Sequence, residues 1–222
     1  MSFVVTLDGP AGAGKSSVAK RLGKQLGIRY LDTGAIYRAI AYWMDKQGIP
    51  PSEGPNLTKM LMDVSIRIEM TGIFVNDENV SEAIRTHRID RIVSGYAALK
   101  SVRDALLDLQ RDQVKYGPLI VDGRDVGSVV FPEADLKFFL TASVEVRAER
   151  RYKELLKKGE AVIYKEVLAQ IRERDRIDSN REIAPLREPE GAIRIDTSSK
   201  EEGEVVHELA FVIQRRMAQD IA

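Results

Sequence analysis

Residues 8–17 read DGPAGAGKSS and directly follow a short apolar run, residues 3–7. They fit the spacing G-x-x-x-x-G-K-S, with Gly9, Gly14, Lys15 and Ser16 at the defining positions. A loop that wraps an anion must turn its N–H groups inward, and β-carbons would block that approach. The helix after such a loop points the positive end of its dipole at the same anion. This segment is therefore predicted to form a strand, a phosphate-binding loop and a helix.

Two side chains in the loop add chemistry to the backbone. Lys15 can reach the β- and γ-phosphates of a nucleoside triphosphate, and the Ser16 hydroxyl can bind Mg²⁺. Apolar residues after Ser16 recur at helical spacing, and Gly27 supplies a helix stop. The predicted nucleotide-binding residues are Gly9, Pro10, Ala11, Gly12, Ala13, Gly14, Lys15, Ser16 and Ser17.

The chain then alternates between short apolar segments and helical patterns. Strands separated by helices predict an α/β fold with a five-stranded parallel sheet flanked by helices. Ligands bind at the carboxyl ends of such strands, and Asp122, which ends one of them, is a second candidate for Mg²⁺. The helix after the second strand is expected to have Thr33 as its N-cap. The predicted strands are 3–8, 28–32, 119–122, 136–140 and 192–195, and the predicted helices are 35–47, 101–116, 143–158, 164–180 and 201–218.

One stretch breaks this alternation. Residues 64–70 alternate apolar and polar side chains, and a Thr71-Gly72 turn leads into a second apolar run. Period two predicts a hairpin or small meander rather than a core helix. With the Pro50-Pro51 and Gly54-Pro55 breaks in front of it, this stretch marks 49–95 as an inserted subdomain between the core segments 1–48 and 96–222. An insert that touches no ligand is the alternative.

Two charged clusters extend the candidate site. Arg124 and Asp125 follow the strand that ends at Asp122, where they can reach a second substrate. Arg174, Asp178 and Arg181 are spaced to share one helical face. Phosphoryl transfer needs guanidinium groups on the charge that spreads over the phosphate. The alternative for both clusters is a solvated polar surface.

Composition limits the partners. Lys plus Arg and Asp plus Glu both number 34, so no net field attracts nucleic acid or an anionic membrane. There is no cysteine, which excludes disulfides, thiolate metal sites and cysteine nucleophiles and fits a reducing cytoplasm. No signal-peptide pattern and no apolar run near the ~18 residues of a spanning helix is found, so a cytoplasmic protein without membrane partners is expected.

Four segments together resemble the bacterial-type cytidylate kinases, which belong to the P-loop nucleoside monophosphate kinases. They are Gly9–Ser17, Leu31–Arg38, Asp122–Gly127 and Arg172–Arg181. The loop is common to many NTPases, but LDTGAIYR and DGRDVG are more specific, with Thr33 where serine is common. The resemblance covers nearly the whole chain. It implies a P-loop NTPase core, a nucleoside-monophosphate-binding subdomain at 49–95, and a short lid at about 151–164.

The resemblance also implies an activity: ATP and CMP or dCMP give ADP and CDP or dCDP, with Mg²⁺ and as a monomer. The implied catalytic residues are Lys15, Arg124, Arg174 and Asp178, and the implied metal ligands are Ser16 and Asp122. Matching positions imply that Arg38 and Arg124 hold the CMP phosphate in a pocket lined by Thr33 and Tyr37. They further imply that Ser94, Arg103 and Asp125 read cytosine with Arg181 alongside, while Arg174 and Asp178 contact the sugar and the transferring region.

The chemistry of cytosine agrees with a carboxylate reader. A carboxylate accepts a hydrogen bond from the N4 amino group of cytosine, whereas uracil presents the O4 acceptor at the same place. Asp125 in this role disfavours UMP. Two other functions stay open: a P-loop kinase of another acceptor, such as a sugar or a shikimate-like acid, and a nucleotide-gated interaction module. A GTPase switch would need an N-K-x-D segment, which the sequence lacks.

Overall fold

The computed structural model describes residues 3–69 and 71–221. The chain divides into two compact units. One comprises the chain up to Leu31, Gln113–Asn180 and the chain from Ala184 onward, and the other comprises Asp32–Asp112 with Arg181–Ile183. Met70, the last apolar residue of the predicted alternation, lies outside the described residues.

The first unit is built on a parallel sheet, which confirms the predicted fold class. Its strands are β1 (Val4–Asp8), β2 (Arg29–Asp32), β6 (Leu119–Asp122), β7 (Leu136–Thr141) and β8 (Ile193–Asp196), in the order β2-β6-β1-β7-β8. The register pairs Val5 with Ile120 on one side and with Leu136 on the other. β1 is thus the central strand, and its carboxyl end leads into the glycine-rich loop.

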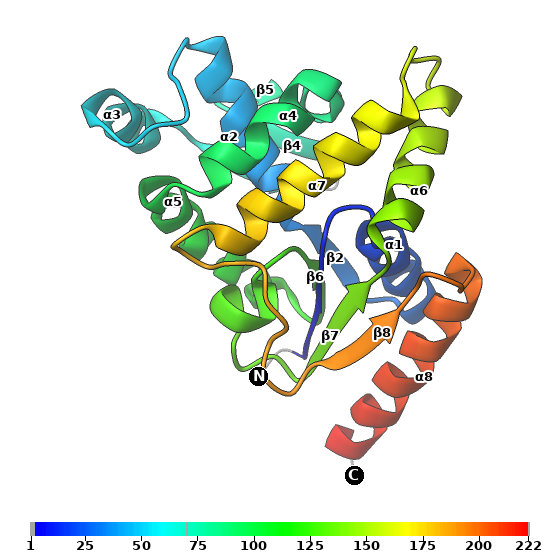
Figure 1. Ribbon diagram of the computed structural model, residues 1–222. Helices are drawn as coiled ribbons and strands as arrows, with labels where there is room; N and C mark the ends of the chain where they lie inside the picture. The colour runs from blue at the N-terminus through cyan, green and yellow to red at the C-terminus, as the bar shows by residue number, and fades with distance from the viewer. Residues whose placement is uncertain (1–2, 70, 222) are drawn as a thin grey trace. The chain divides into compact units, whose positions relative to one another are not determined.

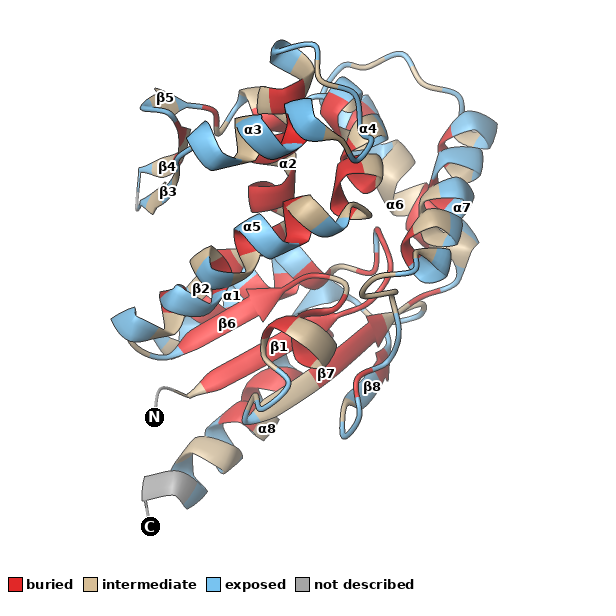
Figure 2. Cartoon of the chain, turned by 90° about the vertical axis from the view of Figure 1, so that its left-hand side faces the viewer, coloured by how far each residue is buried: buried red, intermediate tan, exposed pale blue. Residues whose placement is uncertain are grey.

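Two helices cover one face of this sheet, α1 (Lys15–Leu26) and α8 (Glu202–Ile221) (Figure 1). Val5 and Leu7 of β1 belong to the apolar core that they share, and Figure 2 shows β1 and β6 as buried throughout. Since side chains alternate along a strand, Thr6 and Asp8 point to the opposite face. A short π-helical turn, η3 (Val126–Val130), packs against β1.

The helices α6 (Val144–Lys157) and α7 (Tyr164–Asn180) pack against each other, and their bounds agree with the prediction. The Ser143 hydroxyl caps α6 by accepting a hydrogen bond from the Val146 N–H at 3.3 Å. The connection at 158–163 falls inside the predicted lid, which stays a prediction. Within 3–69 and 71–221, no helix is both long and apolar enough to cross a membrane.

The second unit combines helices with a small antiparallel sheet. The predicted meander is confirmed as three strands, β3 (Ile66–Glu69), β4 (Gly72–Val75) and β5 (Glu78–Asn79), in that order. This unit is wider than the predicted insert, because helices on both sides of 49–95 pack into it. Its helical segments are α2 (Thr33–Lys46), α3 (Pro55–Asp63), η1 (Ala83–Arg85), α4 (His87–Ala97) and α5 (Lys100–Arg111).

Local expectations were wrong at three places. The N-cap of α2 is Asp32 and not Thr33, because the Asp32 carboxylate accepts a hydrogen bond from the Ala35 N–H at 2.8 Å. Pro55 begins α3 instead of breaking the chain, since the first helical position tolerates a missing N–H. The helix predicted over 101–116 ends at Arg111, and a 3₁₀ turn, η2 (Asp112–Tyr116), follows it.

Candidate active site

The glycine-rich loop lies between β1 and α1 in the first unit. At Gly9, where φ is +142°, a β-carbon would lie 1.9 Å from the Leu140 carbonyl oxygen, so β7 passes too close for any other residue. Lys15 begins α1 with a buried side chain, and its Nζ donates a hydrogen bond to the Pro10 carbonyl at 2.8 Å. The structure therefore places the lysine inside the loop that is predicted to hold phosphate.

The electrostatics around Lys15 favour an anion. Burial lowers the pKa of Lys15 well below its usual value, and the nearby cation of Arg124 lowers it further, as does that of Arg174. The carboxylates of Asp122 and Asp8 act in the opposite direction. Three cationic groups near one buried point are stabilised when a negatively charged group joins them. The loop is thus suited to bind the phosphates of a nucleotide.

Asp122 ends β6 and holds two hydroxyl groups. The Ser16 Oγ donates to its Oδ2 at 2.7 Å, and the Tyr30 hydroxyl donates to its Oδ1 at 2.7 Å. The two predicted metal ligands, 106 residues apart, are therefore in direct contact. Hydroxyl and carboxylate oxygens are the kind of ligand that Mg²⁺ prefers.

The rest of a Mg²⁺ coordination sphere would come from phosphate oxygens and water. Within residues 3–69 and 71–221, no group of three or more His, Cys, Asp or Glu side chains is placed to hold a metal. Mg²⁺ usually keeps several waters and is bound through one or two carboxylates plus substrate phosphates. The residues present at Ser16 and Asp122 fit that pattern.

Tyr30 is a site residue that sequence reasoning missed. It lies on β2, next to β6 in the sheet, and its partner Asp122 is 92 residues away in the chain. The available signal is positional, since Tyr30 lies near the carboxyl end of a strand whose neighbour carries a candidate metal ligand. Without the strand order, this signal cannot be used.

The predicted catalytic residues gather in the first unit. The Arg124 Nε donates to the Asp178 Oδ2 at 3.0 Å, and the Asp178 side chain is only 5% exposed. Arg174, four residues before Asp178 on α7, is close enough to Lys15 to lower its pKa. The segment after β6 contributes Arg124 to a cluster around Lys15, and α7 contributes both Arg174 and Asp178.

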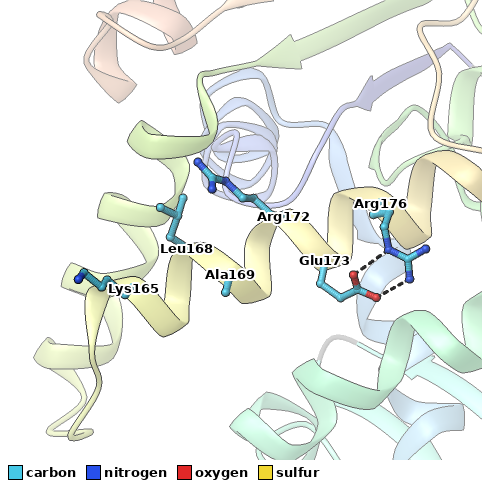
Figure 3. Close-up of a pocket in the computed structure, with 6 residues that line it drawn as sticks. All are labelled: Lys165, Leu168, Ala169, Arg172, Glu173 and Arg176. Atoms are coloured by element: carbon cyan, nitrogen blue, oxygen red, sulfur yellow. Dashed lines mark hydrogen bonds and ion pairs between the residues drawn. The ribbon is translucent and has the colours of Figure 1, made fainter.

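The charged run at 172–181 divides between two faces of α7. Asp178 is buried, whereas the Arg172 and Arg176 side chains are 60% and 64% exposed and pair with glutamates. The exposed face carries a surface hollow in which Glu173 and Arg176 form a two-point ion pair (Figure 3). The solvated-surface alternative therefore describes the outer face only. The hollow is lined by Lys165, Leu168, Ala169, Arg172, Glu173 and Arg176.

An Arg147 bridge ties α6 to the phosphate loop. Its side chain is buried, with Nη1 donating to the Ala11 carbonyl at 3.0 Å and Nε donating to the Ala142 carbonyl at 2.9 Å. Its Nη2 lies 2.7 Å from the Asp175 Oδ2. One guanidinium therefore connects the loop, the start of α6 and the middle of α7. The sequence offers no local pattern that would single out this residue among its neighbouring arginines.

In the second unit, Arg38 lies between two carboxylates. Its Nε is 3.3 Å from the Asp90 Oδ1, and its Nη1 is 3.9 Å from the Asp32 Oδ1. Asp32 also accepts a hydrogen bond from Arg85 at 3.0 Å. Asp90 was not predicted, because only the packing of α4 against α2 brings it to Arg38. The guanidinium predicted to bind a phosphate is thus held by anionic oxygens.

The predicted base-reading residues of this unit are buried. Arg103 donates from Nη1 to the Ala97 carbonyl at 3.0 Å, and its guanidinium carbon lies 5.3 Å from the centre of the Tyr37 ring. Ser94 and Thr33 are also buried, on α4 and at the start of α2. Arg181, which follows α7, groups with this unit, whereas Asp125 is buried in the first unit.

Comparison with known proteins finds a matching family and relatives over nearly the whole chain. The profile of the cytidylate kinase family matches residues 5–215. A cytidylate kinase from Clostridium tetani is 43% identical over 220 residues, covering 99% of this chain and 97% of its own length. Cytidylate kinases from an Exiguobacterium species and from Caldanaerobacter subterraneus are 46% and 44% identical, covering 96% and 100% of this chain and 97% and 99% of their own lengths.

Solved structures support the fold. A protein of uncharacterised function from Eubacterium ventriosum superposes with a TM-score of 0.53 at 10% identity, covering 97% of this chain and 99% of its own. A Thermus thermophilus protein superposes with a TM-score of 0.50 at 15% identity, covering 96% and 97%. At these identities the likeness concerns the fold alone. Since both the family profile and the full-length relatives match, the chain belongs to the cytidylate kinase family.

Proposed function

We propose that this protein is a cytidylate kinase, which transfers the γ-phosphoryl group of ATP to CMP or dCMP and releases ADP and CDP or dCDP. The observation that carries the proposal is the cluster of Lys15, Arg124, Arg174 and Asp178 beside the glycine-rich loop in a chain of this family. A cationic cluster next to a phosphate-binding loop is the arrangement that phosphoryl transfer requires.

The loop residues 9–17 bind the ATP phosphates through backbone N–H groups and Lys15. Ser16 and Asp122 would hold Mg²⁺, which would supply positive charge to the phosphates. Tyr30 keeps the Asp122 carboxylate oriented, because its hydroxyl donates to the Oδ1 atom, whereas Ser16 donates to the Oδ2 atom. Arg124 and Arg174 stabilise the charge that spreads over the transferring group.

The acceptor is bound by the remaining predicted residues. Arg38 and Arg124 bind the CMP phosphate, in a pocket with Thr33 and Tyr37. Asp178 contacts the sugar and orients Arg124, to which it is hydrogen-bonded. The proposed base-reading residues are Ser94, Arg103 and Asp125, with Arg181 alongside.

No general base is required. The second pKa of a phosphate monoester is about 6, so CMP is largely a dianion at neutral pH and its oxygen can attack directly. The work of the protein is alignment and charge neutralisation. Water has to be excluded, because it would otherwise accept the phosphoryl group, and a lid at 151–164 serves that purpose.

Choice of base depends on Asp125. Its carboxylate accepts a hydrogen bond from cytosine N4, and the O4 of uracil would face it as a second acceptor. Such a buried mismatch costs about 1–3 kcal/mol, which is roughly one to two decades in discrimination. Asp125→Asn is expected to reduce the preference for CMP over UMP, because a carboxamide can donate to O4. An unchanged ratio of kcat/KM values would remove Asp125 from base reading.

The activity is tested by a coupled assay of ADP release with a panel of acceptors: CMP, dCMP, UMP, AMP and shikimate. CMP and dCMP are expected to react, and Lys15→Ala is expected to abolish turnover. Lys20→Ala is the matched control, since Lys20 is an exposed lysine of the same helix. If CMP and dCMP are inert while another acceptor reacts, the proposed substrate is wrong.

We further propose a monomer without a nucleic-acid partner that acts in the cytoplasm. Equal numbers of acidic and basic residues, 34 each, provide no net attraction to nucleic acid. The absence of cysteine suits a reducing compartment. Light scattering of the purified protein tests the first point, and a mass near twice the 24.9 kDa chain would contradict it.

A further inference from the structure

Asp8 is the last residue of β1, and its side chain is fully buried. Its two carboxylate oxygens accept hydrogen bonds from two consecutive backbone N–H groups. Val126 N donates to Oδ1 and Gly127 N donates to Oδ2, each at 2.7 Å. Sequence separations of 118 and 119 residues make this a tertiary contact rather than a local turn. None of the roles proposed above uses this carboxylate.

The two amides that Asp8 holds come directly after Asp125. The carbonyl of the same Asp125–Val126 peptide, whose N–H donates to Asp8, accepts a hydrogen bond from the Val129 N–H at 2.9 Å. The backbone of Asp125 is therefore fixed by Asp8 through the next two residues and by the first turn of η3 through its own carbonyl. A proposed base-reading side chain is thus mounted on backbone whose position depends on a carboxylate of another strand.

Gly127 shows how closely strand and loop approach. A β-carbon at this residue would lie 2.7 Å from the Thr6 Oγ1 and 3.1 Å from the Asp8 Oδ2. Thr6 and Asp8 are alternate residues of β1 and face the same side of the sheet. The last glycine of the DGRDVG segment is therefore required where β1 supports the loop, and a side chain there would push the loop away from Asp8.

Asp8 also adjoins the phosphate loop. The next residue is Gly9, which starts the phosphate loop and is itself held tightly against β7. The charges of Asp125 and Lys15 both act on the Asp8 carboxylate. One side chain therefore connects the loop that carries Asp125 with the start of the loop that carries Lys15.

We propose that Asp8 is a positioning residue that fixes Asp125 relative to the phosphate loop and thereby sets the preference for CMP over UMP. This inference rests on the proposed function, in which Asp125 reads the base. Asp8 touches neither substrate. Its effect passes through the two amides of Val126 and Gly127.

The test is Asp8→Asn, with Thr6→Val as the matched control. The carboxamide oxygen keeps one amide contact, while its NH₂ group faces the other N–H donor, so one of the two hydrogen bonds is lost. Thr6→Val changes a residue of the same strand that also lies beside Gly127, and valine has nearly the same shape as threonine. It removes a hydroxyl that has no hydrogen-bond partner among the residues that the structure describes.

The readout is the ratio of kcat/KM for CMP to kcat/KM for UMP, together with thermal unfolding. Loss of one buried hydrogen bond is expected to lower this ratio by about tenfold in Asp8→Asn. Thr6→Val is expected to keep the parent ratio within about twofold, since it breaks no hydrogen bond. A folded Asp8→Asn with the parent ratio would overturn the inference, even if it unfolded at a lower temperature.

A second variant covers the case in which Asp8→Asn does not fold. Gly127→Ala displaces the loop from Asp8 without altering the carboxylate, and the same fall in the ratio is expected. A folded Gly127→Ala with the parent ratio would count against the inference. The activity of the parent protein distinguishes a failure of this inference from a failure of the proposed function. A parent that does not phosphorylate CMP refutes the function, whereas a variant that keeps the parent's preference for CMP refutes only the positioning role.

Discussion

The buried carboxylate of Asp8 makes a specific prediction about stability and pH. Burial raises the pKa of Asp8 from 3.8 to about 7, and the nearby charge of Asp125 adds to this effect. The N–H groups of Gly127 and Val126 act against burial, because they favour the charged form. The folded protein therefore holds a proton on Asp8 over a pH range in which the unfolded chain has released it.

The sign and size of the effect follow from linkage. Between pH 4 and pH 7 the folded state binds more protons than the unfolded state, so the stabilisation present below pH 4 is lost as pH rises. A tenfold change in proton affinity is worth about 1.4 kcal/mol, so the rise in the pKa of Asp8 from 3.8 to about 7 contributes about 4 kcal/mol. Asp8→Asn removes this contribution, because a carboxamide does not titrate.

The assay is urea unfolding of the parent and of Asp8→Asn at a series of pH values from 4 to 8. The free energy of unfolding of the parent is expected to fall relative to that of the variant by about 4 kcal/mol across this range. Asp135→Asn is the reference for losing an exposed carboxylate that accepts a β1 amide. The Asp135 Oδ2 accepts a hydrogen bond from the Val4 N–H at 2.7 Å, but the residue is exposed to solvent. Parallel curves for the parent and Asp8→Asn would refute the reasoning.

Three further substitutions test the site around the phosphate loop. Tyr30→Phe removes a hydrogen bond to Asp122 worth about 1 kcal/mol. The Mg²⁺ concentration that gives half-maximal activity should therefore rise about fivefold. An unchanged concentration would mean that the hydroxyl does not orient this carboxylate. In Arg147→Lys, a single ammonium group cannot replace the guanidinium contacts with two carbonyls and Asp175. KM for ATP, measured by steady-state kinetics, should therefore rise several-fold. An unchanged KM would show that Arg147 does not support the phosphate loop. Gly9→Ala places a β-carbon 1.9 Å from a carbonyl oxygen and should cost at least about 3 kcal/mol in urea unfolding, whereas a loss below about 1 kcal/mol would show that β7 can move aside.

Much of the fold was predictable because its determinants are local. The apolar run before Gly9, the glycine spacing and the helical period after Ser16 specify strand, loop and helix within about 25 residues of chain. The period-two pattern at 64–75 identified the small antiparallel sheet for the same reason. Three local details were wrong. Asp32 competes with Thr33 for the cap, Pro55 suits a first helical position, and the helix after Lys100 tightens into a 3₁₀ turn.

The predicted site residues differ in how the sequence reveals them. Arg174 and Asp178 follow from helical spacing, and Ser16 follows from the loop motif. That Ser16 meets Asp122 depends on strand order, which places β6 beside β1. Tyr30 was missed because its only signal is a neighbour that lies 92 residues away.

By itself, the sequence determined the phosphate loop, the alternation of strands and helices, and the residue types available for phosphoryl transfer, because each depends on neighbours within a few turns of chain. Only the tertiary structure decided which polar groups share a buried space. Asp8 reaches the amides of Val126 and Gly127, and Arg124 reaches Asp178, across 54 to 119 residues. Hydrogen bonds require contact at about 3 Å, and contacts between distant segments are set by how the sheet and its helices pack.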